Sequence, residues 1–86
     1  MRFLTIIVLM STLLLSAVDL NTASAKELQS LKGISKKKAK KIIKYRKHHC
    51  FESIKELRKV KGISKKKAKK ILKKNKGDIE VSECDD

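Results

Sequence analysis

Residues 32–42 read KGISKKKAKKI, and residues 61–71 repeat the same eleven letters. The match extends outward at a constant offset of 29, so that 16 of 23 positions are identical between residues 24–46 and 53–75. A repeat of this length is one supersecondary unit, which cannot bury its apolar face alone. Two copies can pack against each other. The repeat therefore predicts one small domain of two similar units related by a pseudo-twofold axis.

Each copy predicts two helices joined by a tight turn. The first helix begins at Ser24 or Ser53, and a Glu three residues later completes a capping box. Gly33 and Gly62 end these helices as left-handed residues. A serine two residues further on then caps the second helix. The apolar stripes have helical spacing and consist of Leu28, Leu31, Leu57 and Val60 in the first helices and Ala39, Ile42, Ile43, Ala68, Ile71 and Leu72 in the second. We expect an all-α fold of four to five short helices and no sheet.

The repeated turn has the chemistry of a phosphate site. After a glycine, successive backbone N–H groups can point the same way, and the first turn of the next helix adds unpaired N–H groups and a partial positive charge. Together they suit an anion. The predicted contact residues are Gly33, Ile34, Ser35, Lys36 and Lys37 in the first copy and Gly62, Ile63, Ser64, Lys65 and Lys66 in the second. Two such sites match the two strands of a duplex, and contact with the backbone carries no sequence preference.

The charge of the chain favours a polyanionic partner. The 86 residues include 23 Lys and Arg against 9 Asp and Glu, and 22 of the basic residues lie within 26–76. A chain this short has little interior for a catalytic cleft. It has no pattern of a nucleophile with its base. His48-His49-Cys50 lacks a second ligand pair at metal-binding spacing. We expect no enzyme, no metal and no cofactor.

The N-terminus resembles an export signal. Residues 3–18 are uncharged and largely apolar, and Arg2 precedes them. Sixteen helical residues span about 24 Å, less than the roughly 30 Å of a membrane core, which favours a cleaved signal over a retained anchor. Cleavage after Ala17 keeps the Ser24 cap. The expected divisions are a signal peptide or membrane anchor at 1–17, the tandem domain at 18–76 and an acidic tail at 77–86.

The tail and the cysteines leave alternatives open. Residues 77–86 contain five acidic side chains and no basic one, which predicts a disordered, solubilising tail. The alternative is a phosphate mimic that competes with DNA. Cys50 and Cys84 would form a disulfide in an exported protein. Free thiols and a mixed dimer are the other two interpretations.

The repeated pattern L-x-x-L-x-G-I-x-x-x-x-A-x-x-I-I resembles the helix-hairpin-helix DNA-binding motif in tandem. The stretch from Asp19 to Leu28, the pair Tyr45-Arg46 and the run from Phe51 to Leu57 resemble ComEA-family competence proteins. This resemblance implies a periplasmic or cell-surface protein that binds double-stranded DNA without sequence preference during natural transformation. It also implies contact with uptake machinery at the inner membrane and self-association along DNA. Ser35 and Ser64 replace the family's second glycine, and the segment before Phe51 lacks its Gly-Pro.

Two other functions compete with this interpretation. A secreted cationic peptide that attacks membranes needs broad apolar helix faces, whereas these stripes are narrow and the glycine turns would have no role. A protein-interaction module could use the same hairpins. Saturating binding to an unrelated duplex would argue against that second alternative.

Overall fold

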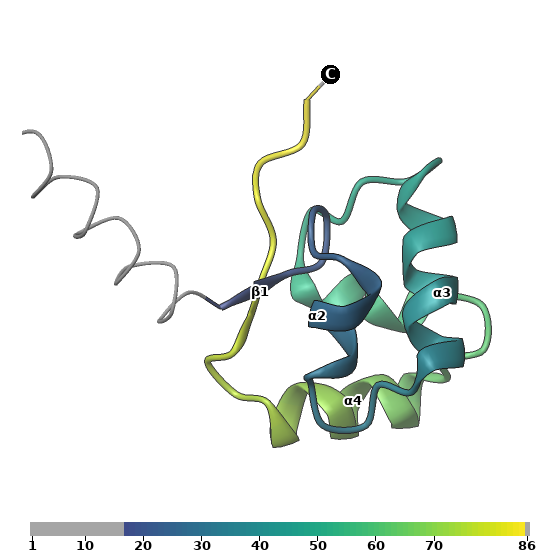
Figure 1. Ribbon diagram of the computed structural model, residues 1–86, viewed down its shortest axis with the longest axis vertical. Coiled ribbons are helices and arrows are strands. Elements are labelled where there is room, and N and C mark those ends of the chain that lie inside the picture. Colours follow the sequence, from purple (N-terminus) through teal and green to yellow (C-terminus); the bar gives the residue numbers. More distant parts are fainter. Residues whose placement is uncertain (1–16, 86) are drawn as a thin grey trace, which may run out of the picture.

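The computed structural model describes residues 17–85, and the expected signal at 1–17 lies outside this range except for Ala17. The elements in chain order are β1 (Val18–Asp19), α2 (Ala25–Gln29), α3 (Lys36–Arg46), the 3₁₀ helix η1 (Ile54–Lys59), α4 (Lys65–Lys74) and β2 (Ile79–Glu80) (Figure 1). The described fold is mostly helical. The expectation of no sheet is wrong, because β1 and β2 pair as two short parallel strands. No helix between residues 17 and 85 has the length and apolar content to span a bilayer.

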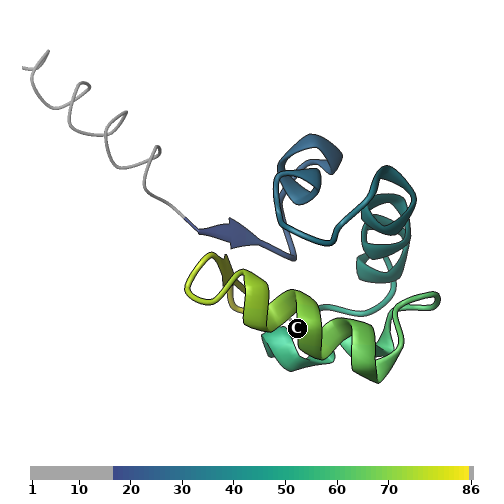
Figure 2. The same ribbon diagram turned by 90° about the horizontal axis from the view of Figure 1, so that it is seen from below.

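The two repeated units each form a helix pair. α2 packs on α3 in the first unit, and η1 packs on α4 in the second. Figure 2 shows the two pairs side by side around a shared interior. One hydrophobic core joins them, and it contains Leu28, Leu31, Ile34, Ala39, Ile42, Leu57, Val60, Ile63, Ala68 and Ile71 from the repeats together with Leu20, Ala23, Phe51 and Ile79. Burial of both apolar stripes in one core is what stabilises two units that are too small to fold alone.

The first capping box forms as predicted. Ser24 Oγ accepts a hydrogen bond from the Glu27 N–H at 3.1 Å, and the Glu27 carboxylate accepts one from the Ser24 N–H at 2.8 Å. These bonds from the Ser24 backbone and side chain favour the ionised carboxylate and hold the pKa of Glu27 below its ordinary value of 4.5.

The second capping box does not form. Ser53 Oγ accepts from the Lys55 N–H, and the Glu56 carboxylate accepts from the Glu52 N–H rather than from Ser53. The first helix of this unit is 3₁₀ instead of α-helical. Its tighter winding keeps Leu57 and Val60, three residues apart, on the same buried side.

Asn21 holds in place the segment between α3 and η1, residues 47–53, which we call the joint. Its side-chain Oδ1 accepts from the Phe51 N–H at 2.8 Å, and its Nδ2 donates to the Phe51 carbonyl at 2.9 Å. Phe51 is fully buried. The half-buried Tyr45 ring lies 5.0 Å from the Phe51 ring, which places Tyr45 at the edge of the core.

The acidic tail is part of the fold. Val18 pairs with Ile79 and Asp19 with Glu80, and Ile79 is buried. Cys50 and Cys84 form a disulfide, which selects one of the three interpretations left open for these cysteines. The expectation of a disordered tail is therefore wrong for residues 78–84. Its acidic composition concealed a single apolar residue, Ile79, that enters the core.

Candidate nucleic-acid interface

The two turns between the paired helices have the same local structure. Gly33 has φ +90° and Gly62 has φ +94°, a left-handed conformation that glycine adopts without a Cβ clash. The serine that follows caps the next helix in both units. Ser35 Oγ accepts from the Lys38 N–H at 3.3 Å, and Ser64 Oγ accepts from the Lys67 N–H at 3.2 Å. We call residues 32–36 the first turn and residues 61–65 the second turn.

The isoleucines in these turns face inward. Ile34 and Ile63 are 4% and 2% exposed. Their N–H groups donate within the turns, to the carbonyls of Leu31 at 3.3 Å and Val60 at 3.0 Å. The sequence placed both residues among the contact residues. The structure gives them a different task, because they anchor the turns to the core and have no N–H left for a ligand.

The N–H groups after each isoleucine are the ones that can take an anion. Within residues 17–85, no acceptor lies in hydrogen-bonding reach of the N–H groups of Ser35, Lys36 and Lys37, nor of their counterparts Ser64, Lys65 and Lys66. All six residues are exposed. These groups belong to the first turns of α3 and α4, where the helix dipole adds partial positive charge. Each turn thus combines free donors, a helix N-terminus and full lysine charges.

Asn75 holds the first turn in place, a role that the repeat pattern does not predict. This residue follows α4 and is 4% exposed. Its Oδ1 accepts from the Lys32 N–H, and its Nδ2 donates to the carbonyls of Lys32 and Ile71, each at 2.8 Å. The equivalent residue of the first unit is Arg46, whose guanidinium donates to the Leu20 carbonyl at 3.1 Å. Asn75 is an amide in a lysine-rich segment and differs from its counterpart in the other unit. That difference is the sequence feature that could have identified it.

Residues 15–75 match the family model of the helix-hairpin-helix motif. The chain belongs to the helix-hairpin-helix family. No similar curated protein and no similar solved structure was found. The match covers both units and both turns of this helix-hairpin-helix protein, and the motif indicates nucleic-acid binding. It agrees with the free N–H groups and lysines at the turns.

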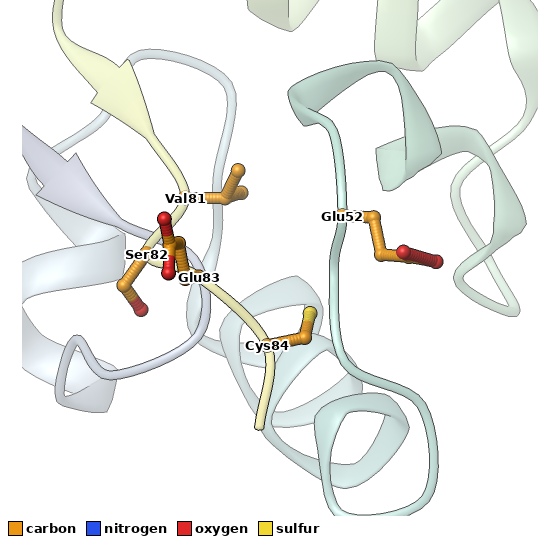
Figure 3. A pocket seen from close by; sticks show the side chains of 5 residues that line it. All are labelled: Glu52, Val81, Ser82, Glu83 and Cys84. Carbon is orange, nitrogen blue, oxygen red and sulfur yellow. The ribbon is translucent and has the colours of Figure 1, made fainter. Parts of the chain in front are cut away.

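Two glutamates line a pocket beside the tail of this helix-hairpin-helix domain. Figure 3 shows a shallow pocket lined by Glu52 of the joint and by Val81, Ser82, Glu83 and Cys84 of the tail. The C-terminal segment leaves the domain at the end opposite α4 and the first turn (Figure 1). This placement argues against a tail that covers the turns as a phosphate mimic. Across residues 17–85, no group of three His, Cys, Asp or Glu side chains is arranged to hold a metal ion.

Proposed function

We propose that this helix-hairpin-helix protein binds double-stranded DNA through its sugar-phosphate backbone without sequence preference. The observation that carries the proposal is the pair of like turns, each with free N–H groups at a helix N-terminus and lysines beside them. Backbone amides and lysines contact phosphates, which are the same in every sequence. A pair of such sites suits the two strands of a duplex.

We infer further that the protein acts outside the cytoplasm, as a DNA receptor in uptake during natural transformation. The export-like residues 3–18, the disulfide and the resemblance to ComEA-family proteins support this role. Contact with the uptake machinery of the inner membrane and self-association along DNA belong to the same proposal.

The folded domain supports a cleavage site after Ala17. The Val18 N–H donates to the Asp78 carbonyl at 2.8 Å, and Leu20 is fully buried. Cleavage after Ala25 would remove β1, Leu20 and the Ser24 cap, whereas cleavage after Ala17 leaves the domain whole. N-terminal sequencing of the exported protein tests this, and a mature chain that starts beyond Leu20 would contradict it. An uncleaved chain in the membrane fraction would indicate the retained anchor instead.

A salt titration tests DNA binding. Fluorescence anisotropy would measure the affinity of the protein for two unrelated duplexes and one single strand between low and physiological salt. We expect equal affinities for the duplexes, with Kd about 10⁻⁴ to 10⁻⁶ M at physiological salt. Contact with about six phosphates gives a log–log salt slope of about −5. A tenfold preference for one duplex, or no binding in dilute buffer, would overturn the proposal.

A further inference from the structure

A basic hollow lies between the first turn and α4. Its lining consists of Gly33, Lys38, Lys67, Lys70, Ile71 and Lys74. The hollow offers about 110 Å³ to the centres of water-sized spheres, and one water molecule needs only about 10–15 Å³ of such space. It therefore has room for one phosphate group. All four of its charged side chains are lysines.

Three of the four lysines come from a different unit than the turn. Lys67, Lys70 and Lys74 are spaced by three and four residues, so they lie along one face of α4. Gly33 belongs to the first unit and lies against this face, because a Cβ built on it would be 3.1 Å from Ile71 Cγ1. Lys38 completes the lining from the first unit, and its Nζ donates to the Gly33 carbonyl at 3.2 Å. The hollow is thus assembled across the interface between the repeats.

The second turn has a reciprocal neighbour. A Cβ built on Gly62 would lie 2.6 Å from the Nζ of Lys41, which belongs to α3 of the first unit. Lys41 is half-buried, although most lysines of the domain are exposed. Each glycine turn therefore lies against the second helix of the other unit, and lysine side chains of that helix lie beside it.

The electrostatics of this arrangement favour an anion. Ammonium groups around one hollow repel each other, and no carboxylate lines the hollow to offset that repulsion. The free N–H groups of Ser35, Lys36 and Lys37 follow the same turn. A phosphate near the turn would satisfy these donors and relieve the repulsion between the lysines.

We propose that each backbone phosphate held by one unit is bound in part by lysines of the other unit. Lys70 and Lys74 of α4 serve the first turn, and Lys41 of α3 serves the second. This inference rests on the proposed function, and it adds three binding residues that lie outside the two turns. The two units therefore form their phosphate-binding sites jointly, and neither unit binds backbone phosphates independently of the other.

Paired substitutions on α4 test the inference in the full chain. Lys70→Gln/Lys74→Gln removes two charges at the hollow, and Lys69→Gln/Lys73→Gln removes two charges from the same helix away from it. Lys69 lines a separate groove with Lys55 and Arg58. We expect the first pair to weaken duplex binding about tenfold more than the control pair. A lysine on a phosphate contributes about one unit of the salt slope, so the first pair should also reduce the slope by about two.

The same test at the second turn compares the variant Lys41→Gln with the control Lys40→Gln. Lys40 is exposed on the same helix, and only Lys41→Gln should reduce the slope, by about one. Circular dichroism would establish that each variant is folded. Equal affinity losses and equal slopes within both comparisons would overturn the inference while wild-type binding stands. Failure of the wild type to bind any duplex would instead overturn the proposed function.

Discussion

We expect the glycines of the two turns to contribute more to binding than any single lysine. Three residues between 17 and 85 have positive φ, and all are glycines: Gly33, Gly62 and Gly77. They differ in their surroundings. A side chain at Gly33 or Gly62 would meet Ile71 or Lys41, whereas nothing lies within 4 Å of a Cβ at Gly77. Gly77 therefore provides a control with equal backbone strain outside the turns.

We expect Gly33→Val and Gly62→Val each to weaken duplex binding about tenfold or more, because the substitution moves the turn away from the helix of the other unit. Gly77→Val should leave the affinity unchanged. All three should lower the free energy of unfolding by about 1–3 kcal/mol, since a β-branched residue is strained at positive φ. Urea unfolding and anisotropy measure the two effects separately. If a single Lys40→Gln change weakened binding as much as Gly62→Val, general charge would be sufficient and the turns incidental.

The second helix of each unit could be predicted because its signals are local. Ser35 and Ser64 cap α3 and α4. Of the two predicted stripes, Ala39, Ile42, Ala68 and Ile71 are buried, and Ile43 and Leu72 are partly buried. The strands and η1 could not be predicted in this way. β1 and β2 have two residues each, too few for a periodic pattern, and they pair across almost the whole domain. The geometry of the joint depends on Asn21, which contacts Phe51 thirty residues away.

The candidate site likewise has features that depend on local sequence and features that depend on long-range packing. The left-handed glycines and the free N–H groups follow from short-range turn chemistry. The burial of Ile34 and Ile63, the Asn75 contact and the position of Lys41 depend on how the units pack. A repeat predicts that two units meet but does not say which side chains meet. For that reason the lysines at 41, 70 and 74 could not be distinguished by sequence from the other lysines of α3 and α4.

Asn75 links α4 to the first turn, and its removal should be costly. Asn75→Ala leaves the Lys32 N–H and carbonyl without their partner in a partly buried site. An unsatisfied buried polar group costs about 1–3 kcal/mol, so we expect the free energy of unfolding to fall by about 2 kcal/mol. Lys76→Ala, at an exposed neighbour, is the matched control. Urea denaturation measures both variants, and equal stability of the two would show that the Asn75 bonds contribute nothing.

At the scale of the whole molecule, the lysine-rich turns are separated from the tail that the disulfide holds. α4 and the first turn lie at one end of the domain, and the C-terminal part of the acidic tail leaves at the other (Figure 1). The disulfide joins that tail to the joint between the units, across 34 residues of chain. It therefore stabilises the closure of β2 on β1 without forming part of the proposed DNA-binding surface. Stability and binding should respond differently to its loss.

Reduction of the disulfide should lower stability and leave the affinity of the folded protein unchanged. In the chain-entropy model, a cross-link that closes a loop of this length stabilises the fold by about 4 kcal/mol. We expect Cys50→Ser/Cys84→Ser to lose about that much free energy of unfolding. At a temperature where both proteins are folded, its duplex affinity should lie within about twofold of the wild type, because the turns keep their contacts with α3 and α4. A reductant should shift the unfolding midpoint of the wild type and not that of the variant. A wild-type midpoint that does not move under reductant, or a folded variant that has lost duplex binding, would contradict this separation of the stabilising end from the binding end.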